Sequence, residues 1–443
     1  AILTGQHIWR LEEAGNIHSR LPDQFATYVG LLEQDGYVVG SYSKAWSPGQ
    51  FRTPSGWVHS SQTTMNPGGK SFRSFEEFHR QKPKDRPFCF WLGSTDAHRA
   101  YKRDSGLQSG MDPAQVVVPD HLPDDMIVRR DILDYYFEVQ RFDSLVGDAL
   151  ALLEKSGELD NTLVVVTSDN GMPFPRAKAT LYDFGTRMPL AIRWPEKIRS
   201  PGRAYNGFVH LSDMAPTFLE AAGLQLPDDM TARSLMDVFA GENTFLRDAA
   251  FTAMERHDGC RKGGKGYPCR AIRTRDFLYI RNYEPDRWPS GDPDAANCAR
   301  AIPFGEVDPS PTKTLLMDNV EKPEYRRFYQ LAFGRRPAEE LYDLRSDPGQ
   351  IENVALLSDY AETKQKLAER LDRYTQETGD PRALGKDAPW DYLPYYGRKK
   401  NQNWVVASRV AVERPREPVD NVWRPLPSSL EKGLLAERVD VWR

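Results

Sequence analysis

The stretch from residue 161 to residue 195 constrains the fold more than any other part of the chain. It opens with an apolar, β-branched run, Leu163 to Thr167, of the length and composition of a buried strand. Ser168-Asp169-Asn170-Gly171 follows directly, and a second apolar run, Met188 to Trp194, returns to the sheet. Polar groups just past the carboxyl end of a core strand line the crevice where α/β proteins bind ligands. The stretch therefore predicts an α/β sheet with a ligand site at its edge.

The side chains at this edge suit a metal ion and an anion. Asp169 and Asn170 offer a carboxylate and an amide carbonyl, which are hard oxygen donors suited to Ca²⁺ or Mg²⁺. Lys178 follows after a proline-punctuated loop and places a cation near the same crevice. The tetrapeptide alone is also ordinary turn chemistry, and by itself it favours a surface turn. The whole stretch is more specific than its tetrapeptide.

Helical segments flank the predicted strands. Residues 128–154 show helical periodicity that is closed by Gly157, and this helix leads into the strand that starts near residue 161. Such a helix-to-strand crossover is typical of an α/β layer fold. Shorter helices are predicted over residues 21–36, over 74–81 behind a capping box at Ser74, and over 212–223. Residues 88–93 are predicted to form another buried strand.

The length of 443 residues favours more than one domain. Residues 1–241 carry the α/β pattern. Residues 242–384 show short strands, polar loops and one charged helix over 360–377, which predicts a smaller α+β domain. Residues 385–443 carry several Trp, Pro and Tyr residues with little periodicity. They predict an extended tail that packs on its own subunit or on a neighbouring one, so a homo-oligomer could form through it.

Composition excludes some partners. With 59 basic and 63 acidic residues the net charge is −4, which gives no general attraction to nucleic acid or acidic lipid. No run approaches the roughly 18 apolar residues of a membrane span. Cys89, within an apolar run, is predicted to be a buried free thiol. Cys260 and Cys269 flank a glycine-rich loop and could pair in an oxidising compartment, and their spacing fits no zinc motif.

The central stretch resembles the sulfatase signature of the alkaline phosphatase superfamily. The resemblance rests on residues 167–171, a lysine within the next turn, Thr180-Leu181-Tyr182 and residues 185–190. The run 168–175 is similar to the branch that contains heparan N-sulfatase and related bacterial polysaccharide sulfatases. The resemblance implies an alkaline phosphatase-like fold, a large mixed sheet sandwiched by helices. It also implies that Asp169 and Asn170 bind a divalent metal, usually Ca²⁺ with Mg²⁺ or Mn²⁺ as alternatives, and that Lys178 contacts the sulfate.

Two more loops of the first domain resemble the family's site. Where sulfatases have Gly-Lys-x-His, Lys44 matches the lysine and Trp46 stands in place of the histidine. Where they have Pro-His after a core strand, His98 matches and Ala97 replaces the proline. The resemblance implies that Lys44 and His98 approach the sulfate, with His98 as a ligand or a general acid. Trp46 and Arg99 are then candidate substrate contacts. Taken alone, Lys44 reads as a solvated loop lysine and His98 as a structural histidine.

The second domain also resembles the polysaccharide-sulfatase branch, in residues 255–258, 279–289 and 340–348. Clustered arginines with Trp and Tyr suit sulfated sugars, through bidentate oxyanion contacts and ring stacking. His257 and Arg287 are the candidate substrate contacts here. A solvated charged edge explains the same residues equally well.

The first five residues, Ala-Ile-Leu-Thr-Gly, resemble the phrase that follows the family's Cys/Ser-x-Pro-x-Arg motif, whose first residue becomes the formylglycine nucleophile. None of the four cysteines is followed by x-Pro-x-Arg. On this resemblance the chain begins just after its own nucleophile. A separate chain, a cleaved precursor or missing residues would each explain such a start. The family implies a periplasmic or extracellular protein, although no signal peptide is visible.

The predicted function is hydrolysis of sulfate esters, or of N-sulfates, on a sulfated oligosaccharide or polysaccharide. Lys44 and Lys178 would hold the non-bridging oxygens, and His98 would bind sulfate or protonate the leaving oxygen. Two alternatives stay open. One is a phosphodiesterase or phosphonate monoester hydrolase of the same superfamily. The other is a protein that binds sulfated sugars without catalysis.

Overall fold

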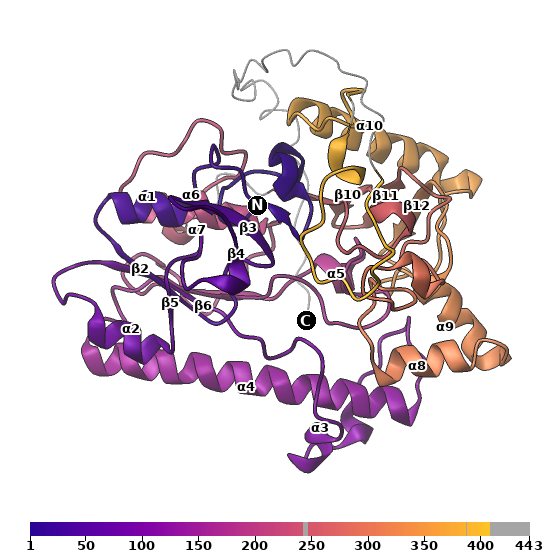
Figure 1. Cartoon of the computed structure of the whole chain (residues 1–443), viewed down its shortest axis with the longest axis horizontal. Coiled ribbons are helices and arrows are strands. Elements are labelled where there is room, and N and C mark those ends of the chain that lie inside the picture. The colour runs from indigo at the N-terminus through magenta and orange to yellow at the C-terminus, as the bar shows by residue number, and fades with distance from the viewer. Residues whose placement is uncertain (242–246, 387, 408–443) are drawn as a thin grey trace.

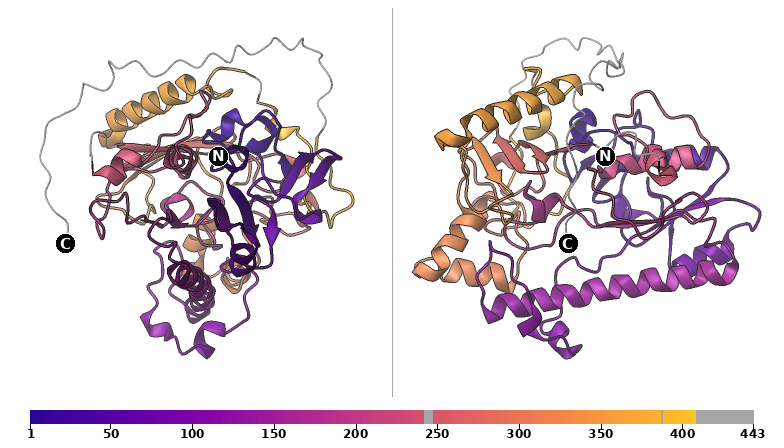
Figure 2. Two further views of the ribbon diagram at one scale, coloured as in Figure 1. Left: turned by 90° about the vertical axis from the view of Figure 1, so that its left-hand side faces the viewer. Right: turned by 180° about the vertical axis from the view of Figure 1, so that it is seen from behind.

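A computed structural model describes residues 1–241, 247–386 and 388–407. Figure 1 shows the first part of the chain, in indigo to magenta, beside the second part, in orange to yellow, with the long helix α4 running beneath both. The view from behind in Figure 2 shows the same arrangement of α4 beneath the rest of the molecule. None of the described helices is both long and apolar enough to cross a membrane.

The described strands of the first part form three small sheets, ordered β5-β2-β6, β7-β8 and β1-β3-β4. The first sheet is parallel and the second is an antiparallel pair. The bounds of these strands are β1 Ser19–Arg20, β2 Val38–Tyr42, β3 Gly49–Thr53, β4 Gly56–His59, β5 Ser71–Phe72, β6 Phe88–Leu92, β7 Val164–Thr167 and β8 Leu190–Arg193.

Helices surround these sheets and continue into the second part of the chain. Their bounds are α1 Tyr28–Gln34, α2 Phe75–Gln81, α3 Ser105–Gln108, α4 Met126–Ser156, α5 Asp183–Thr186, α6 Met214–Ala221, α7 Met236–Ala240, α8 Pro311–Asp318, α9 Pro323–Phe333 and α10 Ala361–Glu377. The predicted helices over 74–81, 128–154 and 360–377 are confirmed within one or two residues. The helix predicted over 21–36 is too long, because Thr27 caps α1 by accepting a hydrogen bond from the Gly30 amide and the residues before it form a loop.

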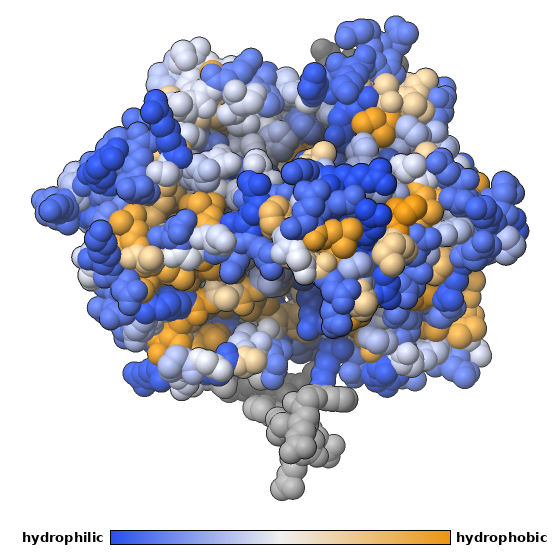
Figure 3. Space-filling view, turned by 90° about the horizontal axis from the view of Figure 1, so that it is seen from below, coloured by the Kyte–Doolittle hydropathy of each residue, from blue (hydrophilic) through white to orange (hydrophobic). Residues whose placement is uncertain are grey.

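The two strands that were predicted to be buried, β6 and β7, are only half-buried along their whole length. Among the described residues β6 pairs only with β2, and β7 pairs only with β8. Each strand therefore keeps one edge without a described neighbour, and this is why the prediction of full burial was wrong. The face seen from below, on the side of α4, mixes hydrophobic with hydrophilic surface (Figure 3).

The second part is built on an antiparallel sheet ordered β12-β11-β10-β9. Its strands are β9 Ala249–Met254, β10 Cys269–Thr274, β11 Phe277–Asn282 and β12 Glu339–Asp343. One face packs against α10 through Leu367 and Leu371. The other face packs against Leu181 and Tyr182, which lie 14 and 15 positions after the end of β7. The central stretch of the sequence thus belongs to both cores.

All four cysteines are free thiols, so the possible Cys260–Cys269 disulfide is absent. Cys269 points into the core formed with Tyr267 and Leu278. Cys260 instead lies beside Cys298, whose Sγ donates to the Cys260 carbonyl at 3.2 Å. Cys260 and Cys269 therefore lie in different packing environments.

The described part of the C-terminal region packs on its own chain. Trp390 is buried and donates from its indole to the Glu12 carbonyl at 2.8 Å. Tyr395 and Trp404 form a small core with Ala299. The prediction of an extended tail and of contacts through it also concerns residues 408–443, which lie outside the described residues.

Buried histidines predict how stability depends on pH. His210 accepts from the Phe251 amide at 3.2 Å, and burial, with Arg247 nearby, lowers its pKa to about 4. Because the unfolded chain has a higher histidine pKa of about 6.5, it binds more protons than the folded chain between these values. We therefore expect the free energy of unfolding to fall as pH drops from about 6.5 towards 4, by up to roughly 3 kcal/mol for His210.

Urea unfolding of the protein and of His210→Gln between about pH 7 and 4.5 measures this contribution. The variant should lose less stability over that range. Carboxylates with strongly lowered pKa values, such as Glu306 at about 2, release their stabilisation below this window. Equal pH slopes for both proteins would contradict the prediction.

Candidate functional site

The predicted metal ligands and the first predicted catalytic lysine meet at the ends of β2 and β7. Lys44, in the loop after β2, places its Nζ 2.7 Å from the Oδ2 of Asp169. The pair is exposed to solvent, with 31% of the Lys44 side chain and 62% of the Asp169 side chain accessible. Asn170 donates from Nδ2 to the Gly171 carbonyl at 2.8 Å, which leaves its Oδ1 available as an acceptor. Two oxygen donors and a cation therefore share this edge.

Two glycines let the loops of the site approach one another closely. A Cβ on Gly171 would lie 1.7 Å from the carbonyl oxygen of Phe184. A Cβ on Gly93, just after β6, would lie 1.7 Å from the carbonyl oxygen of Lys44. Neither contact is possible for any residue with a side chain, so only glycine fits. Gly93 thus holds the loop that carries His98 against the loop that carries Lys44.

The second predicted lysine lies in a cluster with the predicted histidine. The Nζ of Lys178 is 3.5 Å from the Nε2 of His98 and 2.8 Å from the Oδ2 of Asp308. His98 contacts the carbonyl oxygen of Arg99 through Nδ1 at 2.6 Å. A carbonyl can only accept, so Nδ1 carries the hydrogen. The Nε2 of a neutral His98 is therefore the acceptor that faces Lys178.

Asp308 comes from the second part of the chain and was not among the predicted site residues. It is nearly buried, and burial alone would raise its pKa, but the charge and hydrogen bond of Lys178 lower it instead. The loop that carries it is fixed by Lys313 on α8. The Lys313 ammonium donates to the carbonyls of Pro303, Phe304 and Val307 at 2.8–2.9 Å. Burial lowers the pKa of this ammonium to about 8.

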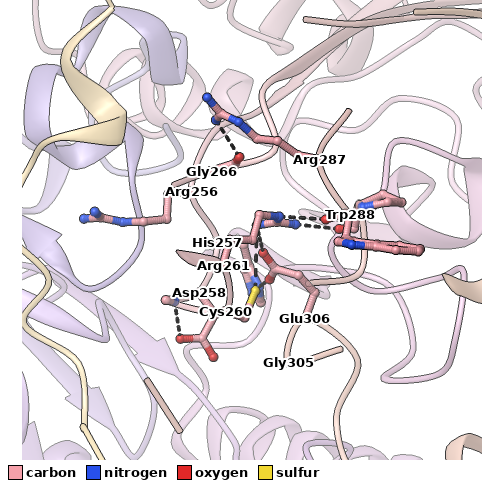
Figure 4. A network of polar contacts seen from close by, with 12 residues as sticks. Arg256, His257, Asp258, Cys260, Arg261, Gly266, Arg287, Trp288, Gly305 and Glu306 are labelled. Carbon is pink, nitrogen blue, oxygen red and sulfur yellow. Dashed lines mark hydrogen bonds and ion pairs between the residues drawn. The ribbon is translucent and has the colours of Figure 1, made fainter. Parts of the chain in front are cut away.

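The same loop orients His257, as Figure 4 shows. Glu306 accepts from the Nδ1 of His257 at 2.6 Å and from the guanidinium of Arg261 at 2.9 Å. Burial would raise the pKa of Glu306, but the charges of His257 and Arg261 outweigh it and hold that pKa at about 2. The His257 ring stays partly exposed. The buried carboxylate of Glu306 thus orients the His257 ring through its Nδ1, and the Nε2 of this ring takes no part in the contact.

Three predicted substrate contacts have other partners in the structure. Arg99 makes a bidentate ion pair with buried Asp131 at 2.7 and 2.9 Å. Arg287 turns towards the Gly266 carbonyl and the Asp391 carboxylate, away from His257 (Figure 4). Trp46 packs edge-on against Phe51, and its backbone is held by Asn66. Their substrate roles stay predictions, and these contacts give each of them a structural role.

The oxygen donors at this edge fit one side of the divalent-metal site that the resemblance implies. Asp169 and Asn170 supply two hard oxygen donors of the kind that Ca²⁺ and Mg²⁺ prefer. Ca²⁺ takes about six to eight oxygen ligands, so these two would form one side of a site. No cluster of three or more acidic, His or Cys side chains suited to a metal occurs within the described ranges. The chemistry of the two donors fits, and the remaining ligands would come from elsewhere.

Comparison with known proteins decides the family. A model of the sulfatase family matches residues 2–224. The chain belongs to the sulfatase family. A second family model, described as the C-terminal region of N-sulphoglucosamine sulphohydrolase, matches residues 176–294 of this sulfatase. The second match spans Lys178 and His257, whereas Glu306 and Asp308 lie beyond the end of both matched ranges.

Relatives and a solved structure extend the comparison. This sulfatase is 27% identical over 345 residues to human N-sulphoglucosamine sulphohydrolase, covering 69% of this chain and 64% of the relative. It is 29% identical over 265 residues to an ulvan-active sulfatase of Formosa agariphila, covering 59% of this chain and 41% of the relative. The chain thus spans less than two thirds of either relative. A structure solved in complex with its substrate D-glucosamine-2-N,6-O-disulfate matches with a TM-score of 0.58 and 19% identity, covering 87% of this chain and 88% of the other.

The last match shows that the two share a fold, and it confirms the predicted α/β class with the sulfatase architecture. Of the residues that the sequence predicted for the site, the structure brings Lys44 to Asp169 and Lys178 to His98, and their roles stay predictions. Sequence reasoning missed Asp308 and Glu306, because both lie in a loop of the second part, 130 and 128 positions after Lys178. No signal in a single sequence indicates that such distant segments meet.

The Lys178–Asp308 ion pair predicts a measurable asymmetry in stability. Its side chains are only 11% and 8% exposed, so removing one charge leaves the other buried and uncompensated. We expect Asp308→Asn to lower the free energy of unfolding by about 3 kcal/mol.

Glu352→Gln is the matched control, because Glu352 pairs with Arg327 on the surface at 3.1 Å and both side chains are mostly exposed. Its cost should stay below about 1 kcal/mol. Chemical unfolding of both variants provides the comparison. Similar losses of unfolding free energy in the two variants would show that the buried pair contributes no more to stability than the surface pair.

Proposed function

We propose that this sulfatase hydrolyses sulfate esters, or N-sulfates, of a sulfated carbohydrate. The observation that carries the proposal is the grouping of Lys178, His98 and Asp308 beside the sheet edge that carries Lys44 and Asp169. The names of its relatives support a sulfated sugar, since one is an N-sulphoglucosamine sulphohydrolase and another is an ulvan-active sulfatase. The proposal extends to a periplasmic or extracellular location, as the family resemblance implies.

The chemistry follows from the charges of these side chains. A sulfate ester carries negative charge on its non-bridging oxygens, and the ammonium groups of Lys44 and Lys178 would hold them as charge develops. In its protonated form, His98 would give the Nε2 proton to the leaving oxygen as its bond to sulfur breaks, because the Nδ1 hydrogen is engaged by the Arg99 carbonyl. Asp308 would keep Lys178 directed at the same point as His98. The nucleophile is assigned to the formylglycine of the family motif, which this sequence does not contain.

Asp169 and Asn170 are the residues that would hold a divalent cation, with Ca²⁺ as the first choice and Mg²⁺ or Mn²⁺ as alternatives. Such a cation, when bound, polarises the sulfate. Lys44 would then have the sulfate as its partner in addition to Asp169. The proposal also requires further metal ligands in addition to these two side chains.

Replacement of Lys178 tests the catalytic assignment. Because Lys178 would contact the sulfate directly, Lys178→Ala in the full-length enzyme should lower kcat for release of inorganic sulfate from a sulfated disaccharide by about 10²–10³-fold. Lys178→Arg, which keeps the charge, should recover part of the rate. Sulfate release is measured by ion chromatography under saturating substrate.

The same assay separates the alternatives. Hydrolysis of a phosphonate monoester without any sulfate release would favour the phosphonate hydrolase reading. Tight binding of sulfated sugar with no hydrolysis of either substrate would favour a binding protein. A Lys178→Ala enzyme with undiminished sulfate release would remove Lys178 from the site.

Alanine variants of His257 and Arg287 distinguish a substrate contact from a structural residue. His257 is partly exposed and oriented by Glu306, so His257→Ala should raise the KM for a sulfated oligosaccharide, a loss of roughly 1–3 kcal/mol in kcat/KM. A small aryl sulfate, which does not reach this ring, should be hydrolysed nearly as before. Arg287→Ala should instead lower the melting temperature, because it leaves buried Asp391 without its ion pair. Equal kinetic losses on both substrates for His257→Ala would contradict the assignment.

A further inference from the structure

A cationic and aromatic surface lies on the small sheet β1-β3-β4, outside the site described above. The register pairs Arg20 with Gln50, Gln50 with His59, and Arg52 with Trp57. Directly paired residues, and residues two positions apart on a strand, point to the same face of a sheet. All five side chains therefore share one face, and each is partly or fully exposed.

The opposite face of the same sheet is its core face. Ser19 and Phe51 are buried there, and Phe51 packs against the Trp46 ring. The sheet is therefore amphipathic, with an apolar inner face and an outer face of Arg, His, Gln and Trp. Packing within the described residues explains the inner face and leaves the chemistry of the outer face unexplained.

The outer face has an ordered arrangement of cations and rings. The Arg20 guanidinium lies between two rings, 4.7 Å from the centre of Trp57 and 4.9 Å from that of Tyr396. The Arg52 guanidinium lies 5.9 Å from the centre of the same Trp57 ring. Stacking on rings holds an arginine in place without neutralising its charge.

The two arginines keep most of their capacity to bind anions. Arg20 donates from Nε to the Gln50 side chain at 3.1 Å, and no carboxylate of the described chain lies within ion-pair distance of it. Arg52 pairs with Asp23 at 3.6 Å, and both side chains are 57% exposed. Such an exposed pair contributes little and is readily exchanged. The terminal nitrogens of Arg20 and the side chain of Arg52 are therefore available to an anion.

This face starts beside the proposed sulfate site. Gly49, the first residue of β3, follows Lys44 by five positions. The Ile17 amide donates to the Arg256 carbonyl at 3.2 Å, so the chain that leads into β1 contacts the segment that carries His257. The Arg20-Gln50-His59 row is thus the end of the sheet nearest the site. Arg52 and Trp57 lie one step farther out, about 7 Å along the strand.

We propose that the outer face of β1-β3-β4 binds the neighbouring sugar units of a sulfated oligosaccharide whose terminal sulfated unit occupies the proposed site. Arg20 and Arg52 would contact sulfate or carboxylate groups, and Trp57 would stack on a sugar ring. This proposal rests on the proposed function, because it places the terminal sulfated unit in the sulfate site and assigns the direction in which the oligosaccharide continues from there. It predicts that affinity increases with the length of the oligosaccharide.

Isothermal titration of the full-length protein with two probes tests this. The probes are a heparan sulfate hexasaccharide and the monosaccharide D-glucosamine-2-N,6-O-disulfate. The hexasaccharide should bind more tightly than the monosaccharide. Arg20→Ala and Trp57→Ala should each weaken hexasaccharide binding by about tenfold, the factor that corresponds to the loss of one charged or stacking contact, and should leave monosaccharide binding unchanged.

Three further variants exclude simpler explanations. Arg80→Ala removes an exposed arginine at the end of α2, which packs on another sheet, and should change neither affinity. Arg20→Lys and Trp57→Phe keep the charge and the ring, and they should retain most of the hexasaccharide affinity even if the alanine variants fold poorly. Unchanged hexasaccharide binding in Arg20→Ala and Trp57→Ala would overturn the proposal, as would equal affinity of the parent protein for both probes.

The outcome is separable from that of the proposed function. Length-dependent binding that is lost in Arg20→Ala, without any sulfate release by the parent enzyme, would support the surface and refute the sulfatase activity. Sulfate release from the hexasaccharide with a KM that none of the variants changes would support the activity and refute the surface.

Discussion

The buried ion pair between Lys178 and Asp308 is the constraint on which the rest of the site depends. Placing two charges where each side chain is about a tenth exposed costs desolvation, and only good geometry offsets that cost. The chain segments that carry Asp308 and Lys178 are each held in place, and this fixes the geometry of the ion pair. Lys313 fixes the loop before Asp308 through three carbonyl groups, and the proline-rich segment before Lys178 is buried at Phe174 and Ala177.

The segment around Lys178 joins the two parts of the molecule. Arg176 is buried, stacks 3.8 Å from the Tyr182 ring and donates to the Gln350 carbonyl at 2.6 Å. Tyr182 donates to the buried carboxylate of Glu340 on β12. The stretch that leaves β7 with the metal-ligand candidates therefore runs directly into the core of the second sheet. Movement of one part relative to the other would break the Lys178 cluster, so the two parts act as one site.

The sequence predicted those features that depend on local patterns. The α4 helix follows from its periodicity, and Asp169, Asn170 and Lys178 follow from a strand end and a family resemblance. Arg99 could be named as a neighbour of His98, but its ion pair with Asp131 depends on how α4 passes beneath that loop. Cys260 and Cys269 are close in sequence, yet strand β10 directs Cys269 into a different core. Pairing across long separations is set by packing, which a single sequence does not display.

The difference between the two lysine pairs explains how one site can be both fixed and accessible. The exposed Lys44–Asp169 pair contributes at most about 1 kcal/mol, so an incoming anion can take Lys44 as a partner at little cost. The buried Lys178–Asp308 pair cannot separate without leaving an uncompensated charge, so it stays formed while a ligand binds. The Lys178 ammonium has further hydrogens besides the one directed at Asp308, and the Nε2 of His98 lies 3.5 Å from its nitrogen. In the proposed site, Lys178 would thus serve as a preset contact beside His98, and Lys44 would exchange its partner when the substrate binds.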